Sequence, residues 1–535
     1  MTGIPFFLRD PVISLKMKYL FCHLFILIGI NQFLNAQIYF SNRYDFLQNA
    51  TPSYSHDIIR DSIKYILINE SIHGIQEYRI FGFITLDTMG NRVGIDIVFE
   101  DSTRGLTTGY PGSFIRTQNN TGFSLVGFNY NWVPTGRWDR GMLWRFDNNL
   151  DTLWTKTYND YPPHDTSFLF RNFRPLPDGG FIIVGSHGLV DGTAPIRINL
   201  NRVDSLGNLI WRKYYGSGYT HFRPYDVSGT SDDGFIIGSI IAHIDPNNSQ
   251  DNDPYLIKTD SIGNFMWSRH LGNPYCCEDR PMVDISSDGN IICGTDFSDS
   301  CWGSGEHYGK INILKINNSN TLIWDKKYGT HKHLLFLNKI RALDNGDIIA
   351  TGHYDYMNDP MRNEVSWIIK TDSAGNELWY REYMLLTATF SQNILYNVIP
   401  TPDNGFIACG TVWPYPPDTG TKDSWVLKVD SLGCEAPNQC WVWQEEIWVK
   451  TFTPEKPFIV YPNPATDRLT LEFHINPEGA EVELYNLTGQ MVLCTRVPRE
   501  RDLFEWDIGR IERGMYILKV TMPGRRAVME KVVVE

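Results

Sequence analysis

One short phrase recurs down this chain at nearly constant intervals, and it constrains the fold more than any other feature. The phrase opens a turn with Asp or Asn, continues with Gly or Asn, and in most copies ends in a run that carries Trp, as in "DSLGNLIW". The copies begin at Asp87, Asp147, Asp204, Asp260, Asn317, Asp372 and Asp430. Successive copies start 60, 57, 56, 57, 55 and 58 residues apart. Such a period predicts a repeat architecture with one structural unit per period.

Each period contains short runs rich in Ile, Val, Tyr and Trp, separated by Gly and Asp turns and without helical periodicity. The pattern predicts an all-β fold with four strands per period. Repeated around an axis, these sheets form a seven-bladed β-propeller, which closes radially and leaves no long open edge. An open solenoid would need capping repeats, and the sequence shows none.

The aspartates of the phrase have a structural interpretation. An Asp side chain accepts hydrogen bonds from the backbone N–H groups of its own turn, and Gly takes the left-handed conformation at little cost. We therefore interpret these aspartates as scaffold residues, in preference to metal ligands or catalytic acids.

The sequence also predicts how the ring closes. The seventh period stops at "DSLGCEAPNQC" without a Trp-bearing fourth strand, whereas the segment "QIYFSNRYDF" near the amino terminus resembles the missing strand. We predict that residues 38–44 complete the last blade and clasp the two ends of the propeller together.

The strand order predicts a face for binding. The turns between strands 1 and 2 and between strands 3 and 4 of a blade lie at one end of an antiparallel sheet, so the other end receives the 2–3 loops and the links between blades. These are long and irregular, at 129–141, 243–255, 296–309, 353–367 and 412–425. We call this end the long-loop face.

The long loops carry aromatic side chains among Asp and Asn, a composition that suits stacking on, and hydrogen bonding to, a sugar or a peptide. The candidate ligand residues are Trp132, Trp138, Trp302, His307, Tyr308, Tyr354, Tyr356, Trp413 and Tyr415. The alternative is that these rings pack the loops onto the propeller. The unknown extracellular partner is thus a glycan or a protein.

Composition excludes some partners. The formal net charge is −13, from 48 basic and 61 acidic residues, and the body of the chain has no dense Lys/Arg tract. Nucleic acid and anionic membrane surfaces are therefore not expected partners.

No catalytic signature is present: the chain lacks a G-x-S-x-G elbow, an H-E-x-x-H pair, a Walker loop and a dinucleotide-binding glycine pattern. "HKH" at 331–333 is interpreted as a solvated loop. No cofactor is predicted, although the Asp/Asn-rich loop 245–253 offers oxygen ligands for Ca²⁺ without the EF-hand spacing. The alternatives to a binding module are a structural spacer and a carbohydrate-active enzyme, a glycosidase or lyase, with acids from several loops. Those acids are Asp139, Asp296, Glu306 and Asp355.

The first 36 residues are interpreted as a signal peptide whose true start is Met17. Lys18 supplies the positive charge, "YLFCHLFILIGI" the apolar segment and "LNA" a small-residue cleavage site. The apolar run is shorter than a membrane-spanning helix requires, and no later stretch spans a bilayer.

Eight cysteines follow the signal peptide. Cys434 and Cys440 enclose a short loop where the last strand is missing, and a disulfide there would stabilise the closure by roughly 2 kcal/mol. A bridge from Cys301 to Cys276 or Cys277 is an open alternative on the long-loop face. Cys293 and Cys409 occupy equivalent repeat positions and are expected to be buried, unreactive thiols.

After the propeller (37–440) and a linker (441–458), the pattern changes. Residues 459–535 contain alternating strands joined by Pro, Asn-Pro and Thr-Gly turns, which predicts a separate small β-sandwich.

This tail resembles the type A C-terminal sorting domain of the type IX secretion system, and an adhesion sandwich is the alternative. The opening motif has Tyr461, Pro462, Asn463, Pro464 and Ala465; the middle one has Leu484, Tyr485, Asn486 and Gly489; the last has Gly514, Tyr516, Leu518, Lys519 and Val520, before Lys531. The resemblance implies recognition by the type IX machinery, passage through the outer membrane and removal of the tail, leaving a released or surface-attached product. The repeats resemble propeller repeats common in such exported proteins.

Overall fold

A computed structural model describes residues 37–47, 52–73, 78–99, 105–118, 120–133, 136–158, 166–189, 196–216, 221–244, 250–271, 280–298, 309–329, 334–355, 364–437, 458–473, 477, 479–497, 503–522 and 527–535. The predicted signal peptide and most of the predicted linker lie outside these residues. The chain divides into two compact units, 1–438 and 439–535. No helix among the described residues is long and apolar enough to cross a membrane.

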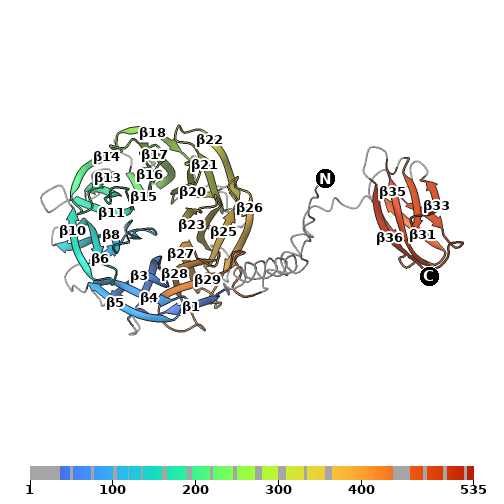
Figure 1. Cartoon of the computed structure of the whole chain (residues 1–535), viewed down its shortest axis with the longest axis horizontal. Helices are drawn as coiled ribbons and strands as arrows, with labels where there is room; N and C mark the ends of the chain where they lie inside the picture. The colour runs from blue at the N-terminus through green and yellow to red at the C-terminus, as the bar shows by residue number, and fades with distance from the viewer. Residues whose placement is uncertain are drawn as a thin grey trace, which may run out of the picture. The chain divides into compact units, whose positions relative to one another are not determined.

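The first unit is a ring of small antiparallel sheets, viewed along its axis in Figure 1, and this confirms the predicted all-β propeller. Four of its sheets each consist of four consecutive strands. They are β2 (Ser53–Asp61), β3 (Lys64–His73), β4 (Tyr78–Asp87) and β5 (Arg92–Phe99); β15 (His221–Gly229), β16 (Phe235–Ile244), β17 (Gln250–Thr259) and β18 (Phe265–His270); β19 (Met282–Ile285), β20 (Ile291–Ser298), β21 (Gly309–Ile316) and β22 (Leu322–Tyr328); and β23 (Leu334–Ala342), β24 (Ile348–Asp355), β25 (Val365–Thr371) and β26 (Glu377–Tyr383).

A nine-stranded sheet lies between the first two of these along the chain. It contains β6 (Gly105–Thr108), β7 (Phe114–Arg116), β8 (Phe123–Val133), β9 (Gly136–Phe146), β10 (Thr152–Tyr158), β11 (Thr166–Pro175), β12 (Phe181–Leu189), β13 (Arg197–Val203) and β14 (Leu209–Tyr215). A single parallel pairing, Ser167 with Asp139, joins β11 to β9. On either side of that pairing the strands follow the antiparallel order of the other sheets.

The predicted clasp is present. The last sheet of the ring has the order β1 (Phe40–Tyr44), β29 (Asp423–Val429), β28 (Phe406–Trp413) and β27 (Gln392–Pro400). Strand β1 therefore occupies the outer position that the seventh period lacks, in register from Phe40 opposite Lys428 to Tyr44 opposite Ser424. Arg43 Nε donates to Asp423 Oδ2 at 2.5 Å and strengthens this pairing.

The recurring turns have the expected geometry. Asp204 Oδ1 accepts from the backbone N–H groups of Leu206 at 2.9 Å and Asn208 at 2.7 Å, and Gly207 adopts φ 76°. The same side-chain bonds occur at Asp87, Asp147, Asp260, Asn317, Asp372 and Asp430. The structural interpretation of these residues is therefore confirmed for their turns.

Outer strands are tied to the next sheet by tyrosine hydroxyls. The Tyr215 hydroxyl, at the end of β14, donates to the Gly263 carbonyl oxygen in the turn of the following sheet at 2.7 Å. Equivalent bonds join Tyr158 to Gly207, Tyr328 to Gly375 and Tyr383 to Gly433, and Tyr44 of the clasp to Gly90. The copies that begin at Asp204 and Asp372 supply both a tyrosine donor and a glycine acceptor, and the other bonds join one copy's donor to another copy's turn.

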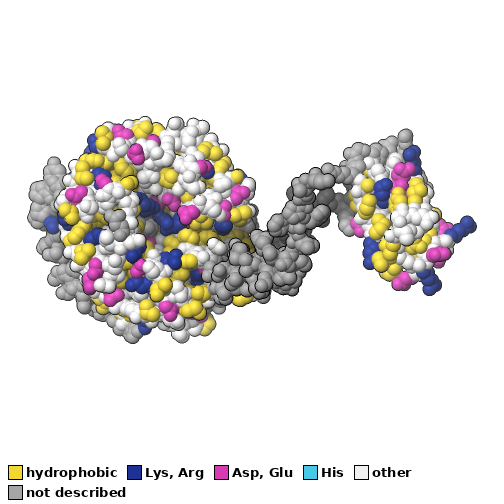
Figure 2. Space-filling view, in the orientation of Figure 1, with side chains coloured by type: hydrophobic (Ala, Val, Ile, Leu, Met, Phe, Trp, Pro, Cys, Tyr) yellow, Lys and Arg dark blue, Asp and Glu magenta, His cyan; other side chains and the backbone are white. Residues whose placement is uncertain are grey.

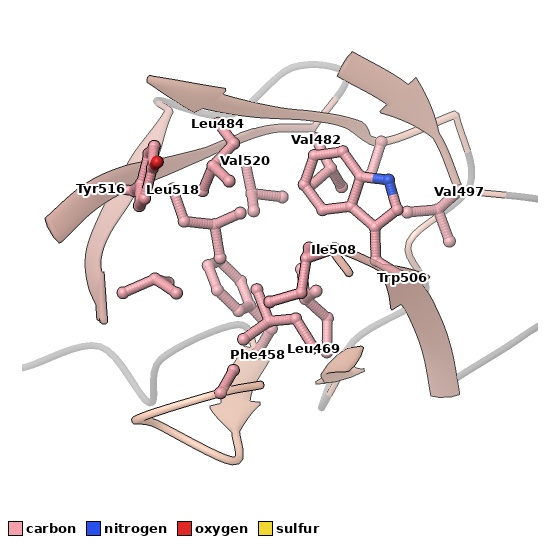
Figure 3. Packing of buried hydrophobic residues seen from close by; sticks show 14 of the residues in the cluster. Phe458, Leu469, Val482, Leu484, Val497, Trp506, Ile508, Tyr516, Leu518 and Val520 are labelled. Carbon is pink, nitrogen blue, oxygen red and sulfur yellow. The ribbon is translucent and has the colours of Figure 1, made fainter. Parts of the chain in front are cut away.

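The second unit is a two-sheet sandwich, as predicted. One sheet is β30 (Phe458–Tyr461), β31 (Arg468–Phe473) and β34 (Leu503–Asp507); the other is β33 (Met491–Arg496), β32 (Glu481–Asn486), β35 (Gly514–Thr521) and β36 (Val528–Val534). Figure 3 shows the core between them, where Leu469, Leu484 and Leu518 are fully buried. The motif residues Gly514 and Tyr516 lie on β35, and the Asn463 amide donates to the Lys531 carbonyl oxygen at 2.7 Å.

Candidate functional site: a central pocket

The innermost strands of the ring share an irregularity that positions the candidate site. In five of them one residue is skipped in the pairing register, so that the strand bulges. The skipped residues are His56 in β2, Arg171 in β11, Tyr225 in β15, Asn338 in β23 and Tyr396 in β27. A bulge re-aims a side chain out of the regular alternation. All five residues line one pocket.

Two further residues complete the arrangement in the sheets without a bulge. Tyr110 lies in the break between β6 and β7, and Arg280 lies two residues before the start of β19 with a left-handed φ of 57°. Both line the same pocket, which has a volume of about 330 Å³. The seven positions are therefore His56, Tyr110, Arg171, Tyr225, Arg280, Asn338 and Tyr396. They follow one another at intervals of 54, 61, 54, 55, 58 and 58 residues, so the pocket has the period of the repeat.

A buried polar layer closes the axis next to the pocket. It is formed by the residues that follow the bulges, Asp57, Asn172, Asp226, Lys339 and Asn397, all of which are buried. Lys339 Nζ donates to Asp226 Oδ2 at 2.8 Å, and burial is the main cause that lowers the pKa of this lysine. Burial also raises the pKa of Asp57, which accepts from the backbone N–H groups of Gly112 and Phe114. Since these residues lie one step closer to the tight turns, the pocket is on the long-loop side of the layer.

One wall of the pocket combines a cation with stacked rings. The rings of Tyr110 and Tyr225 stack with centroids 4.9 Å apart and planes 14° apart. The Arg171 guanidinium lies 4.9 Å from the Tyr110 centroid and 5.6 Å from the Phe128 centroid. Within the described part of the chain no carboxylate forms an ion pair with Arg171.

The other wall holds the second arginine. Arg280 donates to Asn338 Oδ1 at 2.6 Å and lies 4.9 Å from the centroid of Phe336. Beside them His353 is buried, and burial followed by the charge of Arg280 holds the pKa of His353 well below 6.5. Burial raises the pKa of Tyr396 to about 12, so its hydroxyl keeps its proton at neutral pH.

The electrostatics of the pocket contrast with those of the chain. Arg171 and Arg280 are the arginines among the described residues that line it, and no Asp or Glu is among those described residues, while the chain as a whole carries −13. Glu70 lies behind the wall, fully buried, and accepts from the Tyr54 hydroxyl at 2.7 Å. Figure 2 shows basic side chains gathered at the middle of the ring.

The predicted loop aromatics reach the pocket in one place. Trp413 and Tyr415 are exposed, and their centroids lie 6.2 Å apart. Lys422 connects them to the pocket, because its Nζ lies 5.6 Å from the Trp413 centroid and 5.0 Å from that of Tyr54, a lining residue.

Tyr354 is placed differently from the prediction. It is 1% exposed inside β24, and its hydroxyl donates to Glu382 Oε2 at 2.8 Å, so it is a core residue and not part of a ligand surface. Trp132 and Trp138 lie on β8 and β9, and only their backbone is described. Trp302, His307, Tyr308 and Tyr356 lie outside the described residues.

Two of the four acids considered for an enzyme have described side chains, and both bind other parts of the propeller. Asp139 accepts from Ser167 Oγ at 2.7 Å and Asp296 accepts from the Leu337 backbone N–H; both are buried and neither lines the pocket. The Asp355 side chain and Glu306 lie outside the described residues. Among the described residues no group of three or more His, Cys, Asp or Glu could hold a metal ion. The histidines at 331 and 333 and most of loop 245–253 fall outside them.

The cysteines follow the predicted pattern in part. Cys293 and Cys409 are free and fully buried, as expected, and burial raises the pKa of both thiols. Cys434 is buried and disulfide-bonded. Its predicted partner Cys440 lies outside the described residues, as do Cys276, Cys277 and Cys301.

Sequence reasoning missed the seven pocket residues. The signal that could have found them is weak, a polar or aromatic residue shortly before the apolar end of each first strand, as in "FRNF", "PYDV" and "LNKI". Nothing in these strings reveals the bulge, because the skipped residue is defined by its partner strand.

Comparison with known proteins identifies the second unit. Residues 459–535 match the secretion system C-terminal sorting domain. The sorting domain marks the protein as secreted or surface-attached through type IX secretion, with removal of the tail, and implies interaction with the type IX machinery. No curated protein matches the chain.

Solved structures resemble the ring only distantly. A polysaccharide lyase family 25 ulvan lyase bound to -[GlcA(1-4)Rha3S]- has a TM-score of 0.46 at 8% identity, over 74% of this chain and 95% of its own. A protein of unknown function from Dyadobacter fermentans has a TM-score of 0.40 at 10% identity, over 73% and 99%. The β-propeller domain of the Trilobed protease from Pyrococcus furiosus has a TM-score of 0.38 at 9% identity, over 70% and 94%. At these values the likenesses carry no argument about the chemistry of this chain.

Proposed function

We propose that this protein is an exported binding module whose sorting domain directs it across the outer membrane and whose ring holds one unit of a glycan in the central pocket. The observation that carries the proposal is the set of seven repeat-spaced side chains aimed into one cavity.

The chemistry of the walls favours a glycan over a protein surface. The aromatic side chains among the lining residues offer apolar contact for the C–H side of a sugar ring, and the protonated Tyr396 offers a hydrogen-bonding group. The volume of about 330 Å³ suits a small group. A stable protein partner needs roughly 800 Å² of contact on each side, much of it outside such a cavity.

A carbohydrate-active enzyme is the second candidate. Glycoside hydrolysis usually needs two carboxyl groups on either side of the bond that breaks. Among the described residues, none that lines the pocket carries one, and the two described candidate acids bind the scaffold. We therefore place binding ahead of catalysis.

The long loops provide a wider contact surface around the pocket in this proposal. Trp413 and Tyr415 form its described part, and Trp132, Trp138, Trp302, His307, Tyr308 and Tyr356 remain proposed members. We further infer a seven-bladed ring, obtained by dividing the nine-stranded sheet at its single parallel pairing. The signal peptide at 1–36 and the Cys434–Cys440 bridge belong to the same proposal. We propose no bound cofactor, with Ca²⁺ at loop 245–253 as an alternative.

The test uses the chain that begins at residue 37 and a panel of polysaccharides, with retention and product release recorded in the same samples. We expect retention without new reducing ends or unsaturated products. Tyr225→Ala removes one stacked ring and should weaken retention, whereas Tyr214→Ala, at an exposed position of the outer strand β14, should not. Product release would instead support the enzyme, and no retention of any glycan would contradict the proposal.

A further inference from the structure

The outward side of the four-stranded sheet in the sorting domain carries apolar side chains. Side chains alternate between the two sides of a sheet along each strand. Leu484 and Leu518 point inward and are fully buried in the core shown in Figure 3, so the residues on either side of them along the strands point outward. Six outward residues of this sheet are apolar: Tyr485, Met491, Met515, Ile517, Met529 and Val533. We call these six residues the methionine face.

The residues of the methionine face lie next to one another. Tyr485 and Ile517 are opposite each other on the two middle strands, β32 and β35. Met491 on β33 is opposite Tyr485, and Met515 on β35 is opposite Val533 on β36. The three methionines are each 43% to 63% exposed. A contiguous exposed apolar patch is typical of a binding surface, and flexible methionine side chains adapt to the shape of a partner.

The outward side of the other sheet differs. On its middle strand, β31, the outward residues are Arg468, Thr470 and Glu472. Ile459 and Leu503 are exposed on its two edge strands, but both pair with Glu472, so a carboxylate separates them. The methionine face is therefore the apolar one of the two outward sides.

A polar group is fixed beside the methionine face. Glu483 accepts from Lys519 Nζ at 2.7 Å and from the Tyr485 hydroxyl at 3.0 Å, which orients both side chains. Lys531 is exposed opposite Ile517, and among the described residues no carboxylate forms an ion pair with it. The face thus suits a partner whose apolar surface carries a carboxylate that meets Lys531.

The motif residues of the tail divide between the core and this side of the sheet. Packing in the core accounts for one set: Leu484, Tyr516, Leu518 and Val520. It does not account for Tyr485, Lys519 and Lys531, which point outward from the same sheet. These three lie on or beside the methionine face, as a docking role would require.

We propose that the methionine face is the surface through which the sorting domain docks on a component of the type IX machinery, a protein that presents an apolar surface with a carboxylate opposite Lys531. The inference rests on the role of residues 459–535 in export and names the surface that this role uses.

The experiment measures export of the full-length chain in the producing cells. Met515→Glu and Met529→Glu each place a carboxylate on the methionine face at an exposed position. Each should lower the fraction of the chain found at the cell surface and in the medium by about 10-fold, since a charge at the centre of a docking surface is desolvated without a partner. Ile459→Glu and Leu503→Glu are the matched controls on the outward side of the other sheet and should leave this fraction unchanged.

A second pair of variants covers loss of folding. The melting temperature of each purified chain shows whether the sandwich is intact. If Met515→Glu lowers it, Met515→Gln is compared with Leu503→Gln, because these changes remove the apolar group without adding charge. We expect Met515→Gln to reduce export and Leu503→Gln to leave it unchanged.

The outcomes separate this inference from the role of the tail in export. Normal export of folded methionine-face variants, or equal losses in these variants and their controls, would overturn the docking surface. A dimer of the purified chain that Met515→Glu converts into a monomer would show that a second copy covers the face, and would overturn it too. A chain without residues 459–535 that still reached the surface would contradict the role of the tail itself.

Discussion

At the residue scale, one contact explains why the repeated phrase contains both a Gly turn and an aromatic strand. In this contact, which we call the tyrosine latch, the hydroxyl of a tyrosine on an outer strand donates to the carbonyl oxygen of a turn glycine in the next sheet. The Tyr215 hydroxyl belongs to one copy of the phrase, and the Gly263 carbonyl oxygen that accepts its hydrogen bond belongs to the next. Burial is the first cause that raises the pKa of Tyr215, so the hydroxyl remains a donor at any physiological pH. Residues of the phrase therefore form a contact between neighbouring sheets, and this contact recurs around the ring.

Tyr215→Phe tests this latch. The change removes one hydroxyl and leaves the buried Gly263 carbonyl oxygen without its partner, so we expect a loss of about 1–3 kcal/mol in the free energy of unfolding. Denaturant unfolding of the ring measures it. Tyr214→Phe is the control, since Tyr214 is exposed on the same strand and should change stability by less than about 0.5 kcal/mol. Equal effects would show that the latch contributes nothing specific.

The turn aspartates predict an acid dependence. Hydrogen bonds to Asp260, first from the Asn264 backbone N–H, lower its pKa from 3.8, and Asp372 is lowered first by the Asn376 side chain. A carboxyl group with a lowered pKa in the folded state stabilises the fold above its unfolded pKa. The contribution is lost as the pH falls through the folded pKa. Melting temperatures should therefore fall below about pH 4.

Asp260→Asn isolates this effect, because the amide oxygen of Asn still accepts backbone bonds but does not titrate. The difference in melting temperature between the unaltered chain and the variant should shrink as the pH falls from about 6 to about 3, a range that includes the pKa of an unfolded Asp. A constant difference across this range would contradict the assignment.

At the scale of elements, the sequence predicts the features that depend on the repeat period and on local turn chemistry. Strand alternation, the Asx turns and the missing outer strand are all local or periodic signals, so the ring, the tight-turn face and the clasp could be predicted. Tyr354 was misassigned because β24 continues to Asp355, into the segment 353–367 that was expected to be a loop, and this tyrosine is buried in the core.

The pocket could not be predicted for a physical reason. Whether His56 or Tyr225 continues the alternation or is skipped depends on the register with the neighbouring strand. That register is fixed by the partner strand and by the buried polar layer, which are distant in the sequence. Local patterns therefore identified the aromatics of the long loops and overlooked the side chains at the centre of the ring.

Removal of the clasp tests the closure of the ring. A chain that begins at residue 47 lacks β1 and with it the pairing with β29, the Arg43–Asp423 bond and the Tyr44–Gly90 latch. The edge of β29 would then be open, and we expect the melting temperature to fall by about 5–10 °C. A chain that begins at residue 37 is the reference. An unchanged melting temperature would mean that β1 does not contribute to the stability of the ring.

At the scale of the whole molecule, the two units have different tasks and different surfaces. The chain carries a formal net charge of −13, whereas the described lining of the pocket in the ring includes Arg171 and Arg280. The sandwich has its own core, with Trp506, Leu518 and Val532 between its two sheets, so it can be recognised without the ring. Transport and binding can therefore be tested by separate changes in one chain.

Deletion of residues 459–535 should retain the ring in the periplasm, because the matched sorting domain is the part that the secretion machinery recognises. The measurement is fractionation of the producing cells, with surface labelling of intact cells and assay of the medium. The matched control attaches residues 459–535 to an unrelated periplasmic protein, which should then reach the surface or the medium. Leu518→Asp places a charge in the fully buried core of the sandwich and should act like the deletion if the folded domain is what is recognised. Surface display of the truncated chain would contradict the role of the tail in export, while leaving the binding proposal for the ring untouched.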